Sequence, residues 1–117
     1  MNLFIPLLVM MVLDALYLFA TKAFYNKQIR QVQGSDIKIK IVPTLCIYLI
    51  LIFGLYHFIL KEKKPVSDAI ILGFIIYSVF ELTNMAIFDN WNISSVLLDT
   101  SWGAILFGLT TFVSYKI

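Results

Sequence analysis

The sequence predicts an all-α fold, an antiparallel bundle of four transmembrane helices, and two observations carry that prediction. The first is composition: 61% of the 117 residues are hydrophobic and 14% are charged, whereas soluble domains have about 45–50% and about 25%. The second is length, because four apolar segments each reach the ~20 residues that cross a hydrocarbon core of ~30 Å. These segments are residues 2–21, 41–60, 69–88 and 95–115.

We expect the four segments to be helices of a single integral membrane domain, residues 1–117. Backbone polar groups find no water in lipid, and an α-helix bonds all of them within one segment. Membrane strands would be about half as long and would alternate in polarity. The single cysteine, Cys46, has no second cysteine with which to form a disulfide. The composition therefore excludes a soluble domain, a disordered chain and a disulfide-stapled miniprotein.

The connection after the first segment, residues 22–40, is the only one long enough for further structure. Within it, residues 23–33 mix Phe24 and Ile29 with Lys27 and Arg30, a pattern typical of a short helix at the membrane surface. Gly34 would end that helix. A solvated basic loop is the alternative that the same residues allow.

Local signals define the starts of the later segments. Pro43 lies in the first turn of the second segment, Pro65 precedes the third, and Ser95 is predicted to cap the fourth. Proline fits a first helical turn because the amide hydrogen it lacks would be unpaired there in any case. A serine hydroxyl at the N-cap accepts a hydrogen bond from the first free amides.

Three acids lie inside the apolar segments: Asp14, Glu81 and Asp99. A charged side chain at the centre of a membrane helix costs roughly 2.5–3.5 kcal/mol, so each acid needs a reason to be there. Asp14 and Glu81 lie about 10 Å from the ends of their segments at 1.5 Å per residue, and Asp99 lies about 6 Å inside its own. If the helices run up and down in order, all three acids occupy one layer.

The third segment carries a stripe of small and polar residues at helical spacing. Ala69, Gly73, Tyr77 and Glu81 are each four residues apart, and Asn84 follows three later. Small residues let membrane helices approach closely, and polar side chains avoid lipid. The stripe is therefore predicted to face the protein.

These positions predict a polar pocket between the helices, open toward the connection of residues 22–40. Its candidate residues are Asp14, Tyr17, Tyr48, Tyr77, Glu81, Asn84, Asp99 and Trp102. We expect Asp14 and Glu81 to share a hydrogen-bond network there with Asn84, Tyr17 or Trp102. For Asp99, a favourable interaction with the start of its own helix explains the residue equally well without any function.

The residue types point to binding of a proton, a cation or a small polar headgroup. Two close carboxylates in a poorly solvated site disfavour each other's ionisation. The single histidine, His57, lies at the opposite end, and neither a zinc-binding nor a hydrolase motif is present. We expect no metal site, no cofactor and no nucleic-acid partner, while the sequence allows a homo-oligomer.

Three segments resemble the signatures of the predicted membrane protein family known as domain of unknown function 2177. They are residues 13–17 (LDALY) followed by Phe24-Tyr25, residues 80–86 (FELTNMA) followed by Trp91, and residues 98–103 (LDTSWG). The resemblance covers nearly the whole chain. Tyr17 stands where the family usually has Trp, and Phe80-Glu81 where it usually has Tyr-Asp. The resemblance implies a multi-pass membrane protein without an established activity. Bacterial members often lie beside genes of lipid modification, which implies no reaction.

Three functions remain open from the sequence. The first is transport, or assistance to transport, through an intramembrane carboxylate pocket. The second is a membrane-embedded enzyme, or an enzyme's partner, in lipid modification, with Glu81 or Asp14 as general acid or base. The third is a structural or assembly subunit in which the acids only lock the helices together. We place transport before catalysis because no catalytic motif accompanies the acids.

Overall fold

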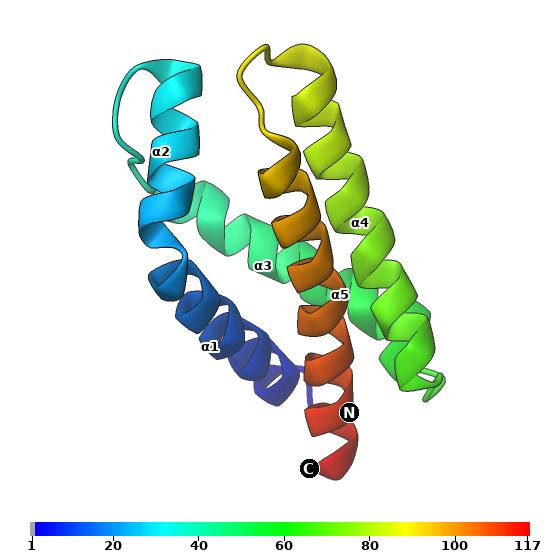
Figure 1. Ribbon diagram of the computed structural model, residues 1–117. Coiled ribbons are helices and arrows are strands. Elements are labelled where there is room, and N and C mark those ends of the chain that lie inside the picture. The colour runs from blue at the N-terminus through cyan, green and yellow to red at the C-terminus, as the bar shows by residue number, and fades with distance from the viewer. Residues whose placement is uncertain (1) are drawn as a thin grey trace.

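The computed structural model describes residues 2–117, and within that range every regular element is helical (Figure 1). The predicted all-α class is therefore confirmed. The elements are α1 (Phe4–Ala20), α2 (Lys22–Gln33), α3 (Ile41–Leu55), its π-helical continuation η1 (Tyr56–Leu60), α4 (Val66–Ile87) and α5 (Ile93–Lys116).

Three helices are each long and apolar enough to cross a membrane: α3 with η1, α4 and α5. The predicted first span, residues 2–21, is different. Its helix α1 has 17 residues, which is about 26 Å at 1.5 Å per residue. It counts as a candidate membrane span only together with α2, and the two helices are bent by 75° relative to each other. The chain thus has three candidate spans, or four if the bent pair of α1 and α2 is one of them.

The bend between α1 and α2 lies at Thr21, whose backbone amide and side-chain hydroxyl both donate to the carbonyl of Tyr17, at 2.9 and 2.7 Å. Beyond it, the helix predicted for residues 23–33 is confirmed, beginning one residue earlier at Lys22. Gly34 ends α2 with φ 77°, a left-handed conformation that glycine adopts without steric cost. The alternative of an unstructured loop over these residues is wrong.

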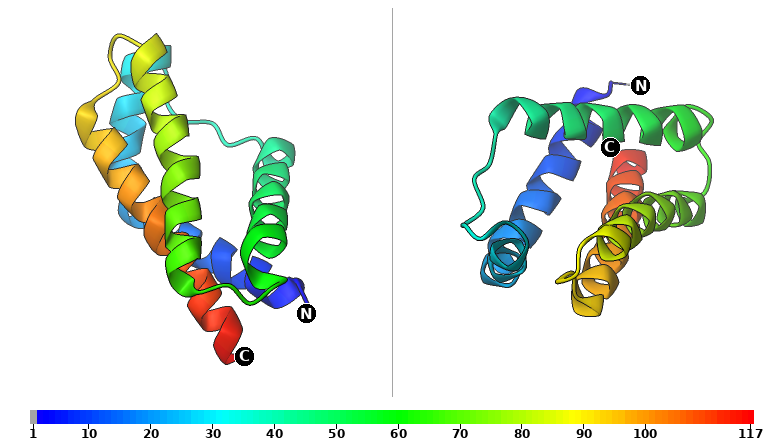
Figure 2. Two further views of the ribbon diagram at one scale, coloured as in Figure 1. Left: turned by 90° about the vertical axis from the view of Figure 1, so that its right-hand side faces the viewer. Right: turned by 90° about the horizontal axis from the view of Figure 1, so that it is seen from above.

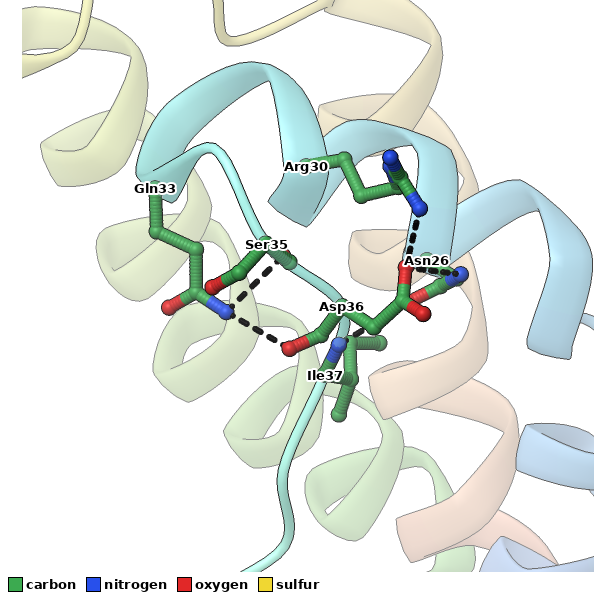
Figure 3. A network of polar contacts seen from close by, with 6 residues as sticks. All are labelled: Asn26, Arg30, Gln33, Ser35, Asp36 and Ile37. Carbon is green, nitrogen blue, oxygen red and sulfur yellow. Dashed lines mark hydrogen bonds and ion pairs between the residues drawn. The ribbon is translucent and has the colours of Figure 1, made fainter.

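The turn after α2 is held by exposed polar contacts (Figure 3). Arg30 donates to the Asp36 carboxylate at 2.6 Å, and Asn26 donates to the same oxygen at 3.3 Å. Asn26 also accepts the backbone amide of Ile37 at 2.9 Å. The hydrogen bonds from Arg30 and Asn26, and the Arg30 charge, hold the pKa of Asp36 below its ordinary value.

The helices α4 and α5 form a tight hairpin, side by side in Figures 1 and 2. The buried residues of α4 are Ala69, Gly73 and Glu81, while Tyr77 and Asn84 are half-buried. The stripe predicted to face the protein is therefore confirmed. A Cβ atom on Gly73 would collide with the carbonyl oxygen of Gly103, so the two backbones meet directly.

The helix α3 is held more loosely. It packs mainly on α1, and only Ile52 and Leu55 are buried along its α-helical part. Its last turn widens into η1, where the Lys61 amide donates to the Tyr56 carbonyl at 2.8 Å. Figure 2 shows α3 standing away from α4 over most of its length. An apolar groove of about 280 Å³ separates them, lined by Ile47, Leu51, Ile76, Tyr77 and Phe80.

Two predicted helix starts need correction. Helix α5 begins at Ile93 with Asn92 at the N-cap position, so Ser95 is not the cap. The reason is tertiary, because the buried Ser95 hydroxyl donates instead to the side chain of Gln28 on α2, at 2.8 Å. Helix α4 begins at Val66, directly after Pro65, and not at residue 69. Pro43 does lie in the first turn of α3, as predicted.

Candidate intramembrane acidic site

Asp14 is buried on α1 and binds two other helices through its side chain. Its Oδ1 accepts a hydrogen bond from the indole nitrogen of Trp102 on α5 at 2.8 Å. Its Oδ2 accepts the hydroxyl of Tyr48 on α3. One carboxyl group therefore joins α1, α3 and α5, and both of its oxygens act as acceptors.

The aromatic residues around Asp14 continue this contact toward α2. The rings of Tyr17 and Trp102 are stacked, with centroids 4.5 Å apart and planes within 2°. The hydroxyl of Tyr17 forms a hydrogen bond with the hydroxyl of Tyr25 on α2. Phenol oxygens both donate and accept, whereas indole nitrogen only donates. The Tyr17–Tyr25 pair is therefore the part of this chain of contacts that can pass a proton in either direction.

Glu81 is the most deeply buried acid, with 1% of its surface exposed. Its Oε1 accepts the indole nitrogen of Trp91 at 2.9 Å. Trp91 is itself buried, in the connection between α4 and α5. The carboxyl group of Glu81 is close enough to that of Asp99 on α5 for the two to influence each other, and Asp99 is similarly close to the phenols of Tyr25 and Tyr17, but no hydrogen bond joins Asp99 to these side chains within residues 2–117. Asp99 thus occupies the position between Glu81 and the tyrosine pair.

Gln28 fastens α2 over this end of the site. Its side chain is 1% exposed, and its Nε2 donates to the Asn90 carbonyl at 2.6 Å. Its Oε1 accepts the Asn92 amide at 2.9 Å and the Ser95 hydroxyl at 2.8 Å. Figure 1 shows the consequence, with α2 lying beside the α4–α5 connection and the start of α5. A single amide side chain therefore holds three groups of a segment more than 60 residues away.

None of the three acids has a basic partner within residues 2–117. The ion pairs in that range are Arg30–Asp36 and Lys64–Glu62, and both are on exposed side chains. The donors that reach Asp14 and Glu81 are neutral indoles and a phenol. The same range contains no group of three or more His, Cys, Asp or Glu side chains placed to hold a metal ion. The site is thus a set of carboxyl groups surrounded by uncharged donors.

Residues 1–116 match the model of a family described as predicted membrane protein, DUF2177. The chain belongs to this family. With its membrane-capable helices, it is a multi-pass integral membrane protein. No curated protein and no solved structure matches the chain. The three segments that carry the family resemblance, residues 13–17, 80–86 and 98–103, supply all three acids of the site.

The structure brings most of the predicted site residues together. Asp14 contacts Tyr48 and Trp102 directly, as two hydrogen bonds show, and Tyr17 stacks on Trp102. Asp14 and Glu81 share no hydrogen bond with each other within the described residues, and their connection runs through α5 and the tyrosines.

Two predicted residues lie outside this hydrogen-bonded chain. Asn84 is half-buried, and its side chain makes no hydrogen bond within residues 2–117, so the partner of Glu81 is Trp91 instead. Tyr77 packs against Gly103 and Phe107 and lines the apolar groove beside α3.

Three residues of the site were not among the predicted pocket residues: Tyr25, Gln28 and Trp91, although Tyr25 and Trp91 do belong to the pattern that resembles the family. Tyr25 and Gln28, with Val32, recur at three- and four-residue spacing, which marks one face of α2. That periodicity could have identified a face packed on protein. Trp91 follows the second family segment, but no local pattern predicts its hydrogen bond to Glu81, which depends on the fold of the α4–α5 connection.

Proposed function

We propose that Asp14, Glu81 and Asp99 form a proton-binding site within the membrane, and that the protein transports, or helps to transport, a small polar molecule or headgroup coupled to that proton. The observation that carries the proposal is the neutrality of the donors around these acids. Several carboxylates without cations in a low-dielectric site are too costly to remain all ionised. A proton is the positive charge that needs the least coordination.

The hydrogen bonds divide the acids into two roles. Both oxygens of Asp14 accept hydrogen bonds from other helices, an arrangement that holds its side chain in place. Glu81 has one oxygen bonded to Trp91, and its carboxyl group lies close to that of Asp99. Two close carboxyl groups share one proton more cheaply than they carry two charges. We therefore assign the proton to Glu81 and Asp99, and a positioning role to Asp14.

A route for the proton toward the α2 end follows from the same contacts. Asp99 lies beside the hydroxyls of Tyr25 and Tyr17, which bond to each other. Gln28 keeps α2, and with it Tyr25, against the start of α5. Movement of α2 at the Thr21 bend would open or close this route.

Proteoliposomes with an internal pH-sensitive dye test the proposal. A potassium diffusion potential drives protons, and the rate of internal acidification is measured. We expect proton flux with the wild type and with Asp68→Asn, a control acid at the far end of α4. Glu81→Gln keeps the acceptor for Trp91 but loses the titrating group, and should lower the flux at least ~10-fold, the scale of one lost proton-transfer group.

Two results would contradict this function. Equal flux in wild type and Glu81→Gln would remove Glu81 from the proton path. No flux in any of them, the wild type included, combined with a loss of thermal stability in Glu81→Gln but not in Asp68→Asn, would favour the alternative of a structural or assembly subunit, in which the acids join helices and carry nothing.

A further inference from the structure

A cavity of about 610 Å³ lies at the end of the molecule opposite the acids. It is bounded by the start of α1, the turn between η1 and α4, and the end of α5, which meet at one end in Figure 2. Its walls are formed by Asn2, Ile5, Pro6, Lys63, Ser114, Tyr115 and Ile117. The walls thus combine apolar side chains with an amide, hydroxyls and one charged side chain, that of Lys63.

The turn that carries Lys63 is strained and locked. Lys63 has φ 52°, the one positive φ of a non-glycine residue within residues 2–117, and a lysine in this left-handed region costs about 1–2 kcal/mol. Three hydrogen bonds hold the turn: Lys63 amide to Leu60 carbonyl at 3.1 Å, Lys64 amide to Ile59 carbonyl at 2.9 Å, and Tyr115 hydroxyl to Lys64 carbonyl at 2.7 Å. The first two of these bonds form the Schellman pattern, in which a left-handed residue ends a helix, and the turn keeps Lys63 at the cavity wall.

The positive charge at the cavity is free. Lys63 takes part in no ion pair in the described part of the chain, whereas Lys64 lies 3.8 Å from Glu62. The turn of residues 61–64 carries three lysines and one glutamate. The ammonium of Lys116 lies 5.4 Å from the centre of the Phe112 ring, away from an acidic partner. This end of the protein therefore attracts anions.

We propose that this cavity binds the phosphate headgroup of an anionic phospholipid, with Lys63 as the cation that faces the phosphate. The cavity lies where the spans α3 with η1, α4 and α5 end, at the level of lipid headgroups. Basic pockets between helix ends at this level recognise anionic headgroups. Ile5, Pro6 and Ile117 form an apolar wall that suits the glycerol and upper acyl region, while the side-chain amide of Asn2 offers a hydrogen-bond donor. The proposal does not depend on the acidic site.

The test uses the full-length protein in detergent, with phosphatidylglycerol and phosphatidylcholine of identical acyl chains as probes. The concentration of each lipid that gives half of its thermal stabilisation is measured. One lysine facing an anionic headgroup corresponds to about fivefold in affinity. We expect the wild type to prefer phosphatidylglycerol by at least about that factor, and Lys63→Gln to lose the preference.

Two further variants separate the cavity from its surroundings. Lys61→Gln removes the same charge from the same turn but from a residue that does not line the cavity, and should keep the preference. Lys63→Gly relieves the left-handed strain and should raise stability while still losing the preference. The proposal is overturned if Lys63→Gln keeps the wild-type preference, if Lys61→Gln loses as much as Lys63→Gln, or if inorganic phosphate alone stabilises the wild type as strongly as the lipid does.

Discussion

The two sides of the molecule are held together by different forces. The α4–α5 hairpin is joined by close backbone approach, since Gly73 and Gly103 leave no room for a Cβ atom between the helices. The α1–α3 side is joined to it by the side-chain hydrogen bonds from Tyr48 and Trp102 to Asp14, together with an apolar core shared with α4 and α5. Lipid provides no hydrophobic drive between helices, so packing and hydrogen bonds are the available means.

From this difference we expect the hairpin to be the more rigid part and the α1–α3 side the more adjustable one. The hairpin contains Glu81 and Asp99 and fixes the distance between them. The helices α1, α2 and α3 contain Asp14, Tyr25 and Tyr48, and they rest on the hairpin through polar contacts and an incomplete apolar seam beside α3. A protein that changes the access to a buried acid needs this combination of a fixed site and movable walls.

Glycine substitutions should produce the strongest contrast between the two sides. Gly73→Ala places a Cβ atom against the Gly103 carbonyl and 2.8 Å from the Phe107 Cβ, so the free energy of unfolding should fall by about 3 kcal/mol, the upper end of overpacking costs. Gly54→Ala on α3 meets nothing within 4 Å and should leave stability unchanged or raise it slightly, because alanine favours a helix more than glycine does. Equal losses in denaturant titrations of the two variants in micelles would show that both sides are packed alike.

The next effect concerns the partner of Glu81. Glu81→Leu leaves the buried indole nitrogen of Trp91 without an acceptor, which should cost about 1–3 kcal/mol of unfolding free energy. Glu81→Gln retains an acceptor oxygen and should lie close to wild type in the same titration. If the leucine variant is as stable as the glutamine variant, the Trp91 bond contributes nothing to holding the hairpin connection.

A smaller loss is expected on the adjustable side. Tyr48→Phe removes the hydroxyl that joins α3 to Asp14 and should lower the unfolding free energy by about 0.6 kcal/mol, the average for hydrogen bonds between membrane helices. Tyr56→Phe is the matched control, because the Tyr56 hydroxyl makes no hydrogen bond within residues 2–117. A larger loss for Tyr56→Phe than for Tyr48→Phe would place the attachment of α3 elsewhere.

The smallest effect should come from the exposed Arg30–Asp36 pair in the turn after α2. Since the pKa of Asp36 is lowered in the folded protein, the ion pair stabilises the fold at pH values above the unfolded-state pKa of about 3.9. This stabilisation is lost as the pH falls through the lower pKa of the folded state. Arg30→Gln should therefore lower the melting temperature slightly at neutral pH. At a pH well below the folded-state pKa of Asp36, it should have no effect on the melting temperature. A difference that grows on acidification would have the wrong sign.

The parts that sequence patterns predicted are those that depend on neighbours along the chain. Segment lengths predicted the three spans α3 with η1, α4 and α5 but not the bent first segment, and four-residue spacing placed Gly73 and Glu81 on the packed face of α4. Gly34 ended α2 because left-handed backbone favours glycine locally. Asp14 lies at the same depth along its helix as Trp102 and Tyr48 do along theirs, and depth could be predicted because the rise per residue of a helix is constant.

The parts that sequence patterns missed depend on contacts between distant segments. Gln28 forms hydrogen bonds with residues that lie 62 to 67 positions further along the chain. No local sequence pattern predicts such partners. The same contact removed Ser95 from the capping role that its local sequence suggested. The 75° bend after α1 likewise follows from how α2 rests on the α4–α5 connection, which the sequence of residues 20–22 does not reveal.

Infrared spectroscopy of the carboxyl stretch, followed through a pH titration of the protein in lipid, tests most directly whether Glu81 and Asp99 share a proton. We predict a protonated carboxyl band at neutral pH in the wild type that is lost in Glu81→Gln, while the control Asp68→Asn keeps it. A wild type without this band at neutral pH, or a band that Glu81→Gln leaves unchanged, would contradict the shared proton and leave the acids as structural hydrogen-bond acceptors.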